Sequence, residues 1–323
     1  MGTMREFMKT HFHHFNARET RQAAQAWVDH LAKGGKMMVT IAGAMSTAEL
    51  GISLAPLIRA GKVHAISCTG ANLEEDLFNL IAHKEYEVLT DWRELSAADE
   101  KALYERGMNR VTDTCIPEAA MRDLDRRLLK LWQAADKAGE SKSPWAFFRE
   151  MLGDGALKEL YQIPPEHSWV LAAHEANIPV IVPGWEDSTL GNIFASHVMA
   201  GRLSGHAVLQ PGTGQMEELA RWYKQQAEEG KSVGFFQIGG GIAGDFPICV
   251  VPMLIQDLEE TATPFWGYFA QIGDSTTSYG SYSGAFPNEK ITWGKIDVGT
   301  PAFMINSDAS IVAPLIFAYV LDQ

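Results

Sequence analysis

Several features that would place a chain in a familiar class are scarce in these 323 residues. There are only three cysteines, Cys68, Cys115 and Cys249, and no two of them form a C-x-x-C pair. An odd number of widely spaced cysteines indicates neither a disulfide framework nor a cysteine metal site. We therefore expect free, buried thiols.

Long apolar runs are absent as well. The longest, around Phe246–Ile255 and Ile311–Leu321, are too short to cross a bilayer. The N-terminal text "MGTMREFMKTHFHHF" has no continuous apolar segment of the kind found in signal peptides. These absences predict a soluble, cytoplasmic protein.

Basic residues are outnumbered by acidic ones, and the last third of the chain contains no histidine. The chain has 27 Lys and Arg against 40 Asp and Glu, a net charge of -13, which disfavours nucleic acid and anionic membranes and tolerates a cationic ligand such as a polyamine. No histidine follows His206, so a site built by the last third of the chain has none of its own. The cluster His11, His13 and His14 lacks partners at metal-site spacing, and we expect no metal.

The chain does contain short apolar runs that alternate with helical patterns. This alternation predicts a mostly parallel sheet with helices on both faces, an α/β fold. Residues 84–165 interrupt the alternation with charged sequence of helical pattern, and we expect them to form a helical insertion. Residues 1–35 are expected to form a helical N-terminal extension of the same single domain. The expected strand and helix pairs are 36–44 with 47–59, 63–70 with 73–82, 178–184 with 190–199, 232–241 with 246–258, strand 265–275, and strand 302–308 with helix 309–321.

The best single motif is Gly239-Gly240-Gly241-Ile242-Ala243-Gly244, which fits G-x-G-x-x-G between an expected strand and an expected helix. Glycines at these positions allow a tight turn and let a pyrophosphate approach the start of the helix. The next apolar run ends at Asp274, whose carboxylate would suit a ribose hydroxyl. The alternative is a glycine turn needed only for helix-sheet packing.

Two acidic stretches follow other expected strands. Glu74, Glu75 and Asp76 open a helix, where acids complement the helix dipole without any ligand. Asp187 in "EDSTLGN" lies where a helix N-cap is expected, with Asn192 close behind. Only their position at the carboxyl ends of strands favours a functional role.

Lys295 in "NEKITWGKI" is a candidate nucleophile. Trp293 and Ile296 normally lie under cover, so the lysine between them is expected to be partly desolvated. A desolvated amine attacks imines and carbonyls, and Glu289 with Trp293 would hold a cationic substrate by charge and cation–π contact. The alternative is an ordinary exposed lysine.

The segments "TGANLEEDL", "EDSTLGN", "IGGG", "EKITWGKI" and "SDAS" resemble, in order and spacing, those of deoxyhypusine synthase, over roughly Ile41 to Tyr319. This resemblance implies a Rossmann-like core, a homotetramer with active sites at dimer interfaces, and tightly bound NAD. It also implies transfer of an aminobutyl group from spermidine, through an imine on a lysine, to an acceptor amine.

Carried over by motif, the nucleophile is Lys295, with Glu289, Trp293 and Ser283 beside the polyamine. Several positions depart from the family: Asp245 replaces a histidine of eukaryotic members, Asn192 replaces an acid, Tyr279 and Tyr282 replace acids, and Gly43-Ala44 replaces Ser-Asn. We expect Asp245, Asn192 and Tyr282 to contact a differently charged or sized amine. The implied NAD contacts are Thr47, Thr69, Gly70, Ala71, Glu74, Glu75, Asp187, Gly239, Gly240, Gly241, Asp308 and Ala309.

The acceptor is left open by the sequence. It is either a lysine of the hypusine-bearing translation factor or a free diamine, as in homospermidine synthesis. A non-catalytic protein that binds NAD or polyamine, and an ordinary NAD-dependent dehydrogenase, are further alternatives. We favour the transferase because Lys295, Trp293 and Glu289 occur together.

Overall fold

Six parallel strands form the central sheet of the computed structural model, which describes residues 3–276 and 280–322. Their spatial order is β6-β2-β1-β7-β8-β9. Counted along the chain, this is the order 3-2-1-4-5-6 of a doubly wound sheet, with its switch point between β1 and β7. The prediction of a mostly parallel sheet is confirmed. The strands are β1 (Lys36–Ile41), β2 (Ala65–Cys68), β6 (Val180–Ile181), β7 (Val233–Ile238), β8 (Tyr268–Gly273) and β9 (Ala302–Asn306).

Helices cover both faces of this sheet because successive strand residues point to opposite sides. On one face Phe236 of β7 meets Trp27 of α2, with ring centroids 4.7 Å apart. On the other face Phe235 meets Trp266 at 4.9 Å, and Tyr223 of α10 packs on the same indole. The first face is covered by α2 (Phe15–Ala32), α3 (Gly51–Arg59), α4 (Gly70–Ala82), α8 (Trp169–Glu175) and α14 (Ala309–Leu321), and the second by α10 (Gly212–Glu228), α11 (Gly241–Ile248) and α12 (Val250–Pro252).

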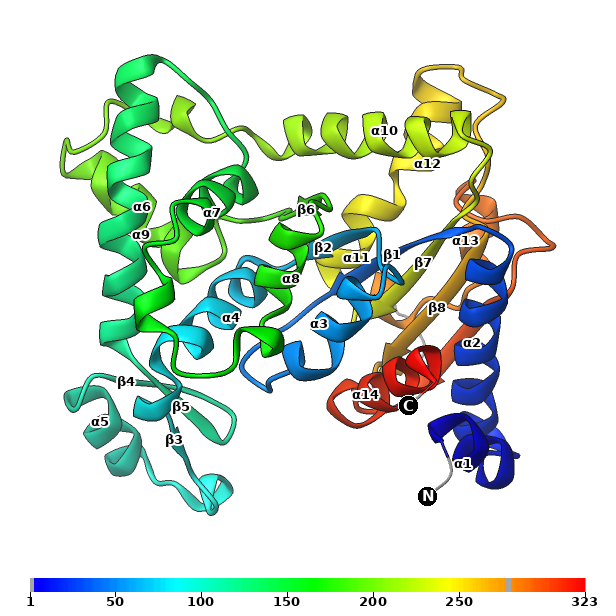
Figure 1. The fold of residues 1–323 in the computed structure, drawn as a ribbon, viewed down its shortest axis with the longest axis horizontal. Helices are drawn as coiled ribbons and strands as arrows, with labels where there is room; N and C mark the ends of the chain where they lie inside the picture. Colours follow the sequence, from blue (N-terminus) through cyan, green and yellow to red (C-terminus); the bar gives the residue numbers. More distant parts are fainter. Residues whose placement is uncertain (1–2, 277–279, 323) are drawn as a thin grey trace.

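The segment 84–165 contains helices, as expected, and in addition a three-stranded antiparallel sheet of order β3-β5-β4. Thr112, in the tight turn between β4 and β5, has φ 57°. No glycine marks this turn, so the sequence gives no hairpin signal there. In Figure 1 this small sheet lies at the lower left, far from β8 and α13. Its elements are β3 (Glu87–Val88), α5 (Ala97–Glu105), β4 (Met108–Val111), β5 (Thr114–Pro117), α6 (Glu118–Ala138) and α7 (Pro144–Gly153).

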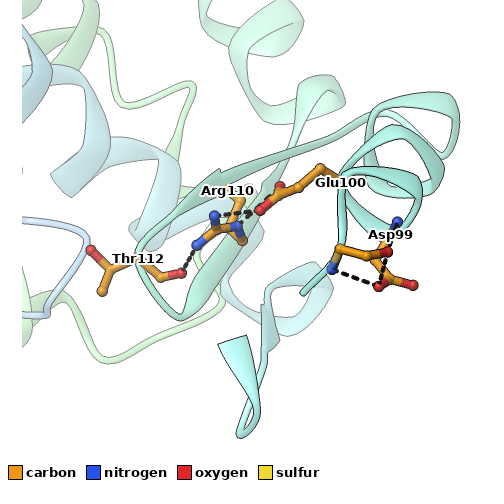
Figure 2. A network of polar contacts seen from close by, with 5 residues as sticks. Asp99, Glu100, Arg110 and Thr112 are labelled. Atoms are coloured by element: carbon orange, nitrogen blue, oxygen red, sulfur yellow. Dashed lines mark hydrogen bonds and ion pairs between the residues drawn. The ribbon is translucent and has the colours of Figure 1, made fainter. Parts of the chain in front are cut away.

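Polar contacts join α5 to this small sheet (Figure 2). The guanidinium of Arg110 donates to both carboxylate oxygens of Glu100, from Nε at 3.1 Å, and to the carbonyl of Thr112. Asp99 accepts from the backbone N–H of Ser96, which caps the start of α5. Pairs this exposed contribute at most about 1 kcal/mol, so they fix the orientation of α5 more than they stabilise it.

Some element ends differ from the sequence expectation. The helix expected from Thr47 begins only at Gly51, because Ser46 and Thr47 are bonded to α4 instead. Helix α4 begins three residues early, since the Thr69 hydroxyl caps it by accepting from Asn72 N–H. The helix expected from Phe246 begins directly after the glycine turn, at Gly241.

The remaining elements are short or terminal. Within the described part of the chain, no helix is both long and apolar enough to cross a bilayer. They are α1 (Met4–His11), α9 (Thr189–Met199), α13 (Glu289–Thr292), the π-helical turn η6 (Met253–Asp257), and the 3-10 turns η1 (His83–Glu85), η2 (Trp92–Glu94), η3 (Lys158–Leu160), η4 (Pro165–His167), η5 (His206–Val208) and η7 (Tyr282–Gly284).

Candidate active site

The carboxyl ends of all six parallel strands lie along one edge of the sheet. Backbone bonds continue past the strand ends, from Ala42 N–H to Ile238 O at 3.0 Å and from Gly239 N–H to Ile272 O at 2.8 Å. The Thr69 hydroxyl donates to Gly43 O at 2.7 Å, which ties the end of β2 to that of β1. In doubly wound sheets ligands bind at this edge, next to the switch point.

The glycine turn after β7 lies at this switch point. Gly239 and Gly241 have φ 74° and 61°, a left-handed conformation that few side chains tolerate. A Cβ on Gly240 would come within 1.9 Å of Ser283 Oγ, whereas one on Gly241 would meet nothing within 4 Å. The backbone is thus open to solvent at the first residue of α11, and the N–H groups at the start of a helix suit a phosphate. These residues fit the pyrophosphate of a dinucleotide.

A cavity of about 380 Å³ opens beside α11, and we call it the lysine cavity. It holds five of the predicted catalytic and substrate residues, drawn from α11, the 280–285 segment and α13 with its following turn. Its walls are Asp245, Cys249, Gly280, Ser281, Tyr282, Ala285, Glu289, Lys290, Trp293 and Lys295.

Lys295 is buried in this cavity and is only 7% exposed. Its Nζ donates to Asp245 Oδ1 at 3.0 Å and lies 5.2 Å from the ring centroid of Tyr282. Asp245, which we expected to contact substrate, is therefore engaged by the nucleophile candidate itself. The residues that cover Lys295 differ in part from our prediction. Ile296 is buried, but Trp293 is 66% exposed and lies at the rim of the cavity, 5.9 Å from Lys295 Nζ.

A second lysine, Lys290, lies in the same cavity and is only 2% exposed. Its Nζ lies 4.6 Å from the ring centroid of Phe269 and 4.9 Å from that of Tyr282. Burial, and after it the charge of Lys295, lowers the pKa of Lys290 to about 8. Sequence reasoning missed this residue, because a four-residue helix has no periodicity that would mark its buried side.

A larger hollow of about 660 Å³, which we call the acid cavity, lies between α4, α9 and the segment 109–122. It collects Asn192 and several of the predicted cofactor contacts, and it shares no wall residue with the lysine cavity. One chain therefore places the predicted residues in two separate hollows. The walls of the acid cavity are Ala71, Glu74, Glu75, Phe78, Asn109, Val111, Ile116, Glu118, Met121, Arg122, Asp187, Ser188, Thr189, Asn192, Ile193 and Ser196.

The three acids of α4, Glu74, Glu75 and Asp76, are all buried but have different partners. Glu74 accepts from the N–H groups of Thr189 and Leu190, and so caps α9. Asp76 accepts from Ser168 Oγ and from the N–H groups of Trp169 and Val170, and so caps α8. Glu75 accepts from the hydroxyl of Thr47, at 2.6 Å.

Burial is the largest influence on the charge of these acids. It raises the pKa of Glu74 and of Glu75 to about 7 and that of Asp76 to about 6, against the opposing effect of their hydrogen-bond donors. The capping alternative weighed from the sequence thus describes Glu74 and Asp76. Of the three acids, Glu75 keeps the most acceptor capacity for a ligand, and it lines the acid cavity.

The other predicted residues lie along the sheet edge. Ser283 accepts from Gly241 N–H at 3.2 Å and so packs on the glycine turn. Asp308 caps α14 through Ser310, immediately before Ala309. Asp274 is exposed after β8, Gly70 begins α4, and Tyr279 lies outside the described residues.

The sequence also predicts free, buried thiols and no metal site. Cys68 and Cys115 are free and buried, while Cys249 is partly exposed in the lysine cavity. In the described ranges no three side chains among His, Cys, Asp and Glu gather closely enough to hold a metal ion.

Comparison with known families decides the relationship of this chain. The family model described as deoxyhypusine synthase matches residues 4–320. The chain belongs to the deoxyhypusine synthase family. This confirms the resemblance drawn from the five motifs and supports, in broad terms, an aminobutyl transferase.

Individual relatives support the same family assignment. It is 30% identical to the deoxyhypusine synthase-like protein of Nostoc sp., covering 98% of this chain and 81% of that protein. It is 26% identical to a Methanosarcina mazei protein named "Probable deoxyhypusine synthase 2", covering 94% and 81%. A crystal structure assigned as a deoxyhypusine synthase from Entamoeba histolytica superposes with a TM-score of 0.59 at 12% identity over 97% of this chain and 91% of that one, which confirms the α/β fold.

Proposed function

We propose that this protein is an NAD-dependent transferase that moves an aminoalkyl group from a polyamine-type donor, through an imine on Lys295, to an acceptor amine. The observation that carries the proposal is the pairing of a buried Lys295 with Asp245 at 3.0 Å, inside a cavity adjoining the glycine turn. Desolvation favours the uncharged, nucleophilic form of an amine, and an adjacent carboxylate can accept the proton that the amine loses.

NAD would be held by Gly239, Gly240 and Gly241 at its pyrophosphate, with Thr69, Glu75, Asp187 and Asp308 as further contacts along the edge. When bound, NAD would supply reversible hydride transfer, from the carbon next to the donor nitrogen and back to the final imine, with no net oxidation. The donor nitrogen loses a proton as the hydride leaves, and the final nitrogen regains one.

The lysine cavity would perform the exchange between these two events. Uncharged Lys295 adds to the carbon of the C=N bond, both Nζ protons pass to the departing nitrogen so that the amine half of the donor leaves as a neutral amine, and the fragment stays as an imine on Nζ. Asp245 accepts the proton that Lys295 must lose before it attacks. An acceptor amine then displaces Nζ by the same exchange, while Tyr282 and Trp293 hold the cationic chain against their rings.

The acid cavity would join this reaction through the cofactor. It shares no wall residue with the lysine cavity of the same chain, and NAD that lies along the sheet edge from the glycine turn to Glu75 and Asp187 would connect the two. We propose that copies of the chain associate as a homotetramer. The acceptor is then either a protein lysine or a free diamine, both of which reach the cavity from its Trp293 rim.

Chemical trapping tests the covalent step. The protein is incubated with NAD and spermidine, putrescine or agmatine, reduced with borohydride, and digested for peptide mass analysis. We expect a stable secondary amine on Lys295, and we expect Lys295→Ala to lower product formation by several orders of magnitude. Lys101→Ala, which removes an exposed lysine, is the control and should change nothing.

Two results would overturn the proposal together: no adduct on Lys295 with any of these amines, and the same product profile for wild type and Lys295→Ala. Reduced cofactor accumulating during turnover would instead indicate an ordinary dehydrogenase. Binding of NAD or amine without any product would indicate a non-catalytic protein.

A further inference from the structure

Lys290 places a buried positive charge with few direct partners in the lysine cavity. Within residues 3–276 and 280–322 its ammonium group has no ion-pair partner, and it reaches only the Ala285 carbonyl, at a long 3.5 Å. The rings of Phe269 and Tyr282 contribute cation–π attraction. That attraction offsets only part of the cost of removing an ammonium group from water.

The charges on the cavity walls determine which ligand suits this lysine. Two lysines, Lys290 and Lys295, face two acids, Asp245 and Glu289. Asp245 is engaged by Lys295 at 3.0 Å, and Glu289 is exposed at the rim. Among the described residues of one chain, the deepest charge in the cavity without an acidic partner is therefore positive, which is the wrong sign for the far end of a simple polyamine.

Both ammonium groups border the same ring, since Lys290 Nζ and Lys295 Nζ lie 4.9 and 5.2 Å from the centroid of Tyr282. Lys290 is therefore within reach of the other end of a short aliphatic chain attached to Lys295. An ammonium at that end would be repelled, whereas a carboxylate would complete a charge-assisted hydrogen bond in a desolvated place.

We propose that Lys290 binds a carboxylate of the substrate, so that the lysine cavity takes an amine that also carries a carboxylate, such as a diamino acid, in preference to the corresponding simple diamine. The inference rests on the proposed function, because it concerns the same cavity and the amine that reacts there. It assigns to Lys290 the recognition of the substrate and to Lys295 its chemistry.

Matched pairs of amines that differ only by the carboxylate test this proposal. The pairs are L-ornithine with putrescine, L-lysine with cadaverine and L-arginine with agmatine, and binding to the full chain in the presence of NAD is measured by calorimetry. We expect at least one carboxylated member to bind about tenfold or more tightly than its partner. Equal or tighter binding by all three simple amines would overturn the proposal.

Variants of Lys290 separate recognition from packing. Lys290→Met keeps an unbranched chain between the two rings and removes the charge, so it should abolish the preference within a pair and leave the simple amine bound as before or more tightly. Lys290→Arg keeps a cation and should retain part of the preference. Lys101→Met, with the same loss of charge at an exposed site, should behave as wild type.

Persistence of the full preference in Lys290→Met would show that another group reads the carboxylate. The binding measurement needs no turnover, so it is independent of the proposed function. A carboxylate preference, with no trapped adduct on Lys295 and the same product profile for wild type and Lys295→Ala, would uphold the role of Lys290 and overturn the transferase. An adduct formed equally from both members of every pair would do the reverse.

Discussion

Buried charges in two regions of this molecule have different kinds of partner. In α4, Glu74 and Asp76 accept backbone N–H groups at the starts of α9 and α8. In the lysine cavity, Lys290 has aromatic rings and one distant carbonyl around its ammonium group. The α4 acids are satisfied by the fold, whereas Lys290 is not.

This difference separates structural charges from charges available to a ligand. A buried group whose hydrogen bonds are complete gains little from a ligand, and its removal leaves N–H groups unpaired. A buried group with incomplete bonding destabilises the free protein and gains most when a ligand supplies the missing partner. Three measurements sharpen or break the comparison.

The largest effect on stability is expected at Asp76. Asp76→Ala leaves Ser168 and two backbone N–H groups without their acceptor, and we expect the free energy of unfolding to fall by about 3 kcal/mol. Urea denaturation measures this loss. Asp154→Ala, at an exposed carboxylate that accepts one bond from Ala156 N–H, should cost well under 1 kcal/mol. Similar losses for both variants would contradict a capping role for Asp76.

The sequence predicts the frame of this molecule better than the contacts within it. Apolar runs such as 233–238 identify buried strands because the alternation needed for a parallel sheet is local. The glycine turn and the covered position of Lys295 follow from neighbouring residues in the same way. The exposed Trp293 shows the limit of inferring burial from residue type, because the sequence does not distinguish an indole at the rim of a cavity from one in the core.

Contacts between distant segments lie beyond such reasoning. Asp245 and Lys295 are 50 positions apart, and Ser168 and Asp76 are 92 apart. Nothing local distinguishes the acid that caps α8 from the neighbouring Glu75, which bonds one hydroxyl. Lys290 is hidden for the same reason, because its burial depends on β8 supplying Phe269 from another part of the chain.

A smaller change in the free energy of unfolding is expected with pH, and its sign is opposite in the two regions. The raised pKa values of Glu74, Glu75 and Asp76 mean that the folded state holds their protons more tightly, so stability falls as pH rises from about 4.5 to about 7. The lowered pKa of Lys290 means that the folded state releases its proton more easily, so stability rises from about pH 8 to about 10.5.

Urea denaturation across this pH range measures both slopes. Each should amount to roughly 1–3 kcal/mol over its window, after partial relaxation around the buried groups. Lys290→Met should flatten the alkaline slope and raise stability at pH 7.5, while leaving the acidic slope unchanged. An alkaline slope that persists in Lys290→Met would show that Lys290 is not the group responsible.

The smallest effect distinguishes the two adjacent glutamates. Glu74→Gln leaves one oxygen for two N–H donors, and we expect a loss of about 1 kcal/mol in urea denaturation at pH 6, where little charge is removed. Glu75→Gln keeps its acceptor for Thr47 and should leave stability nearly unchanged. Calorimetric titration with NAD at pH 8 should then show weaker binding in Glu75→Gln. If Glu75→Gln binds NAD normally and loses more stability than Glu74→Gln, the division of α4 into caps and a ligand-facing carboxylate is wrong, because both acids would then be structural.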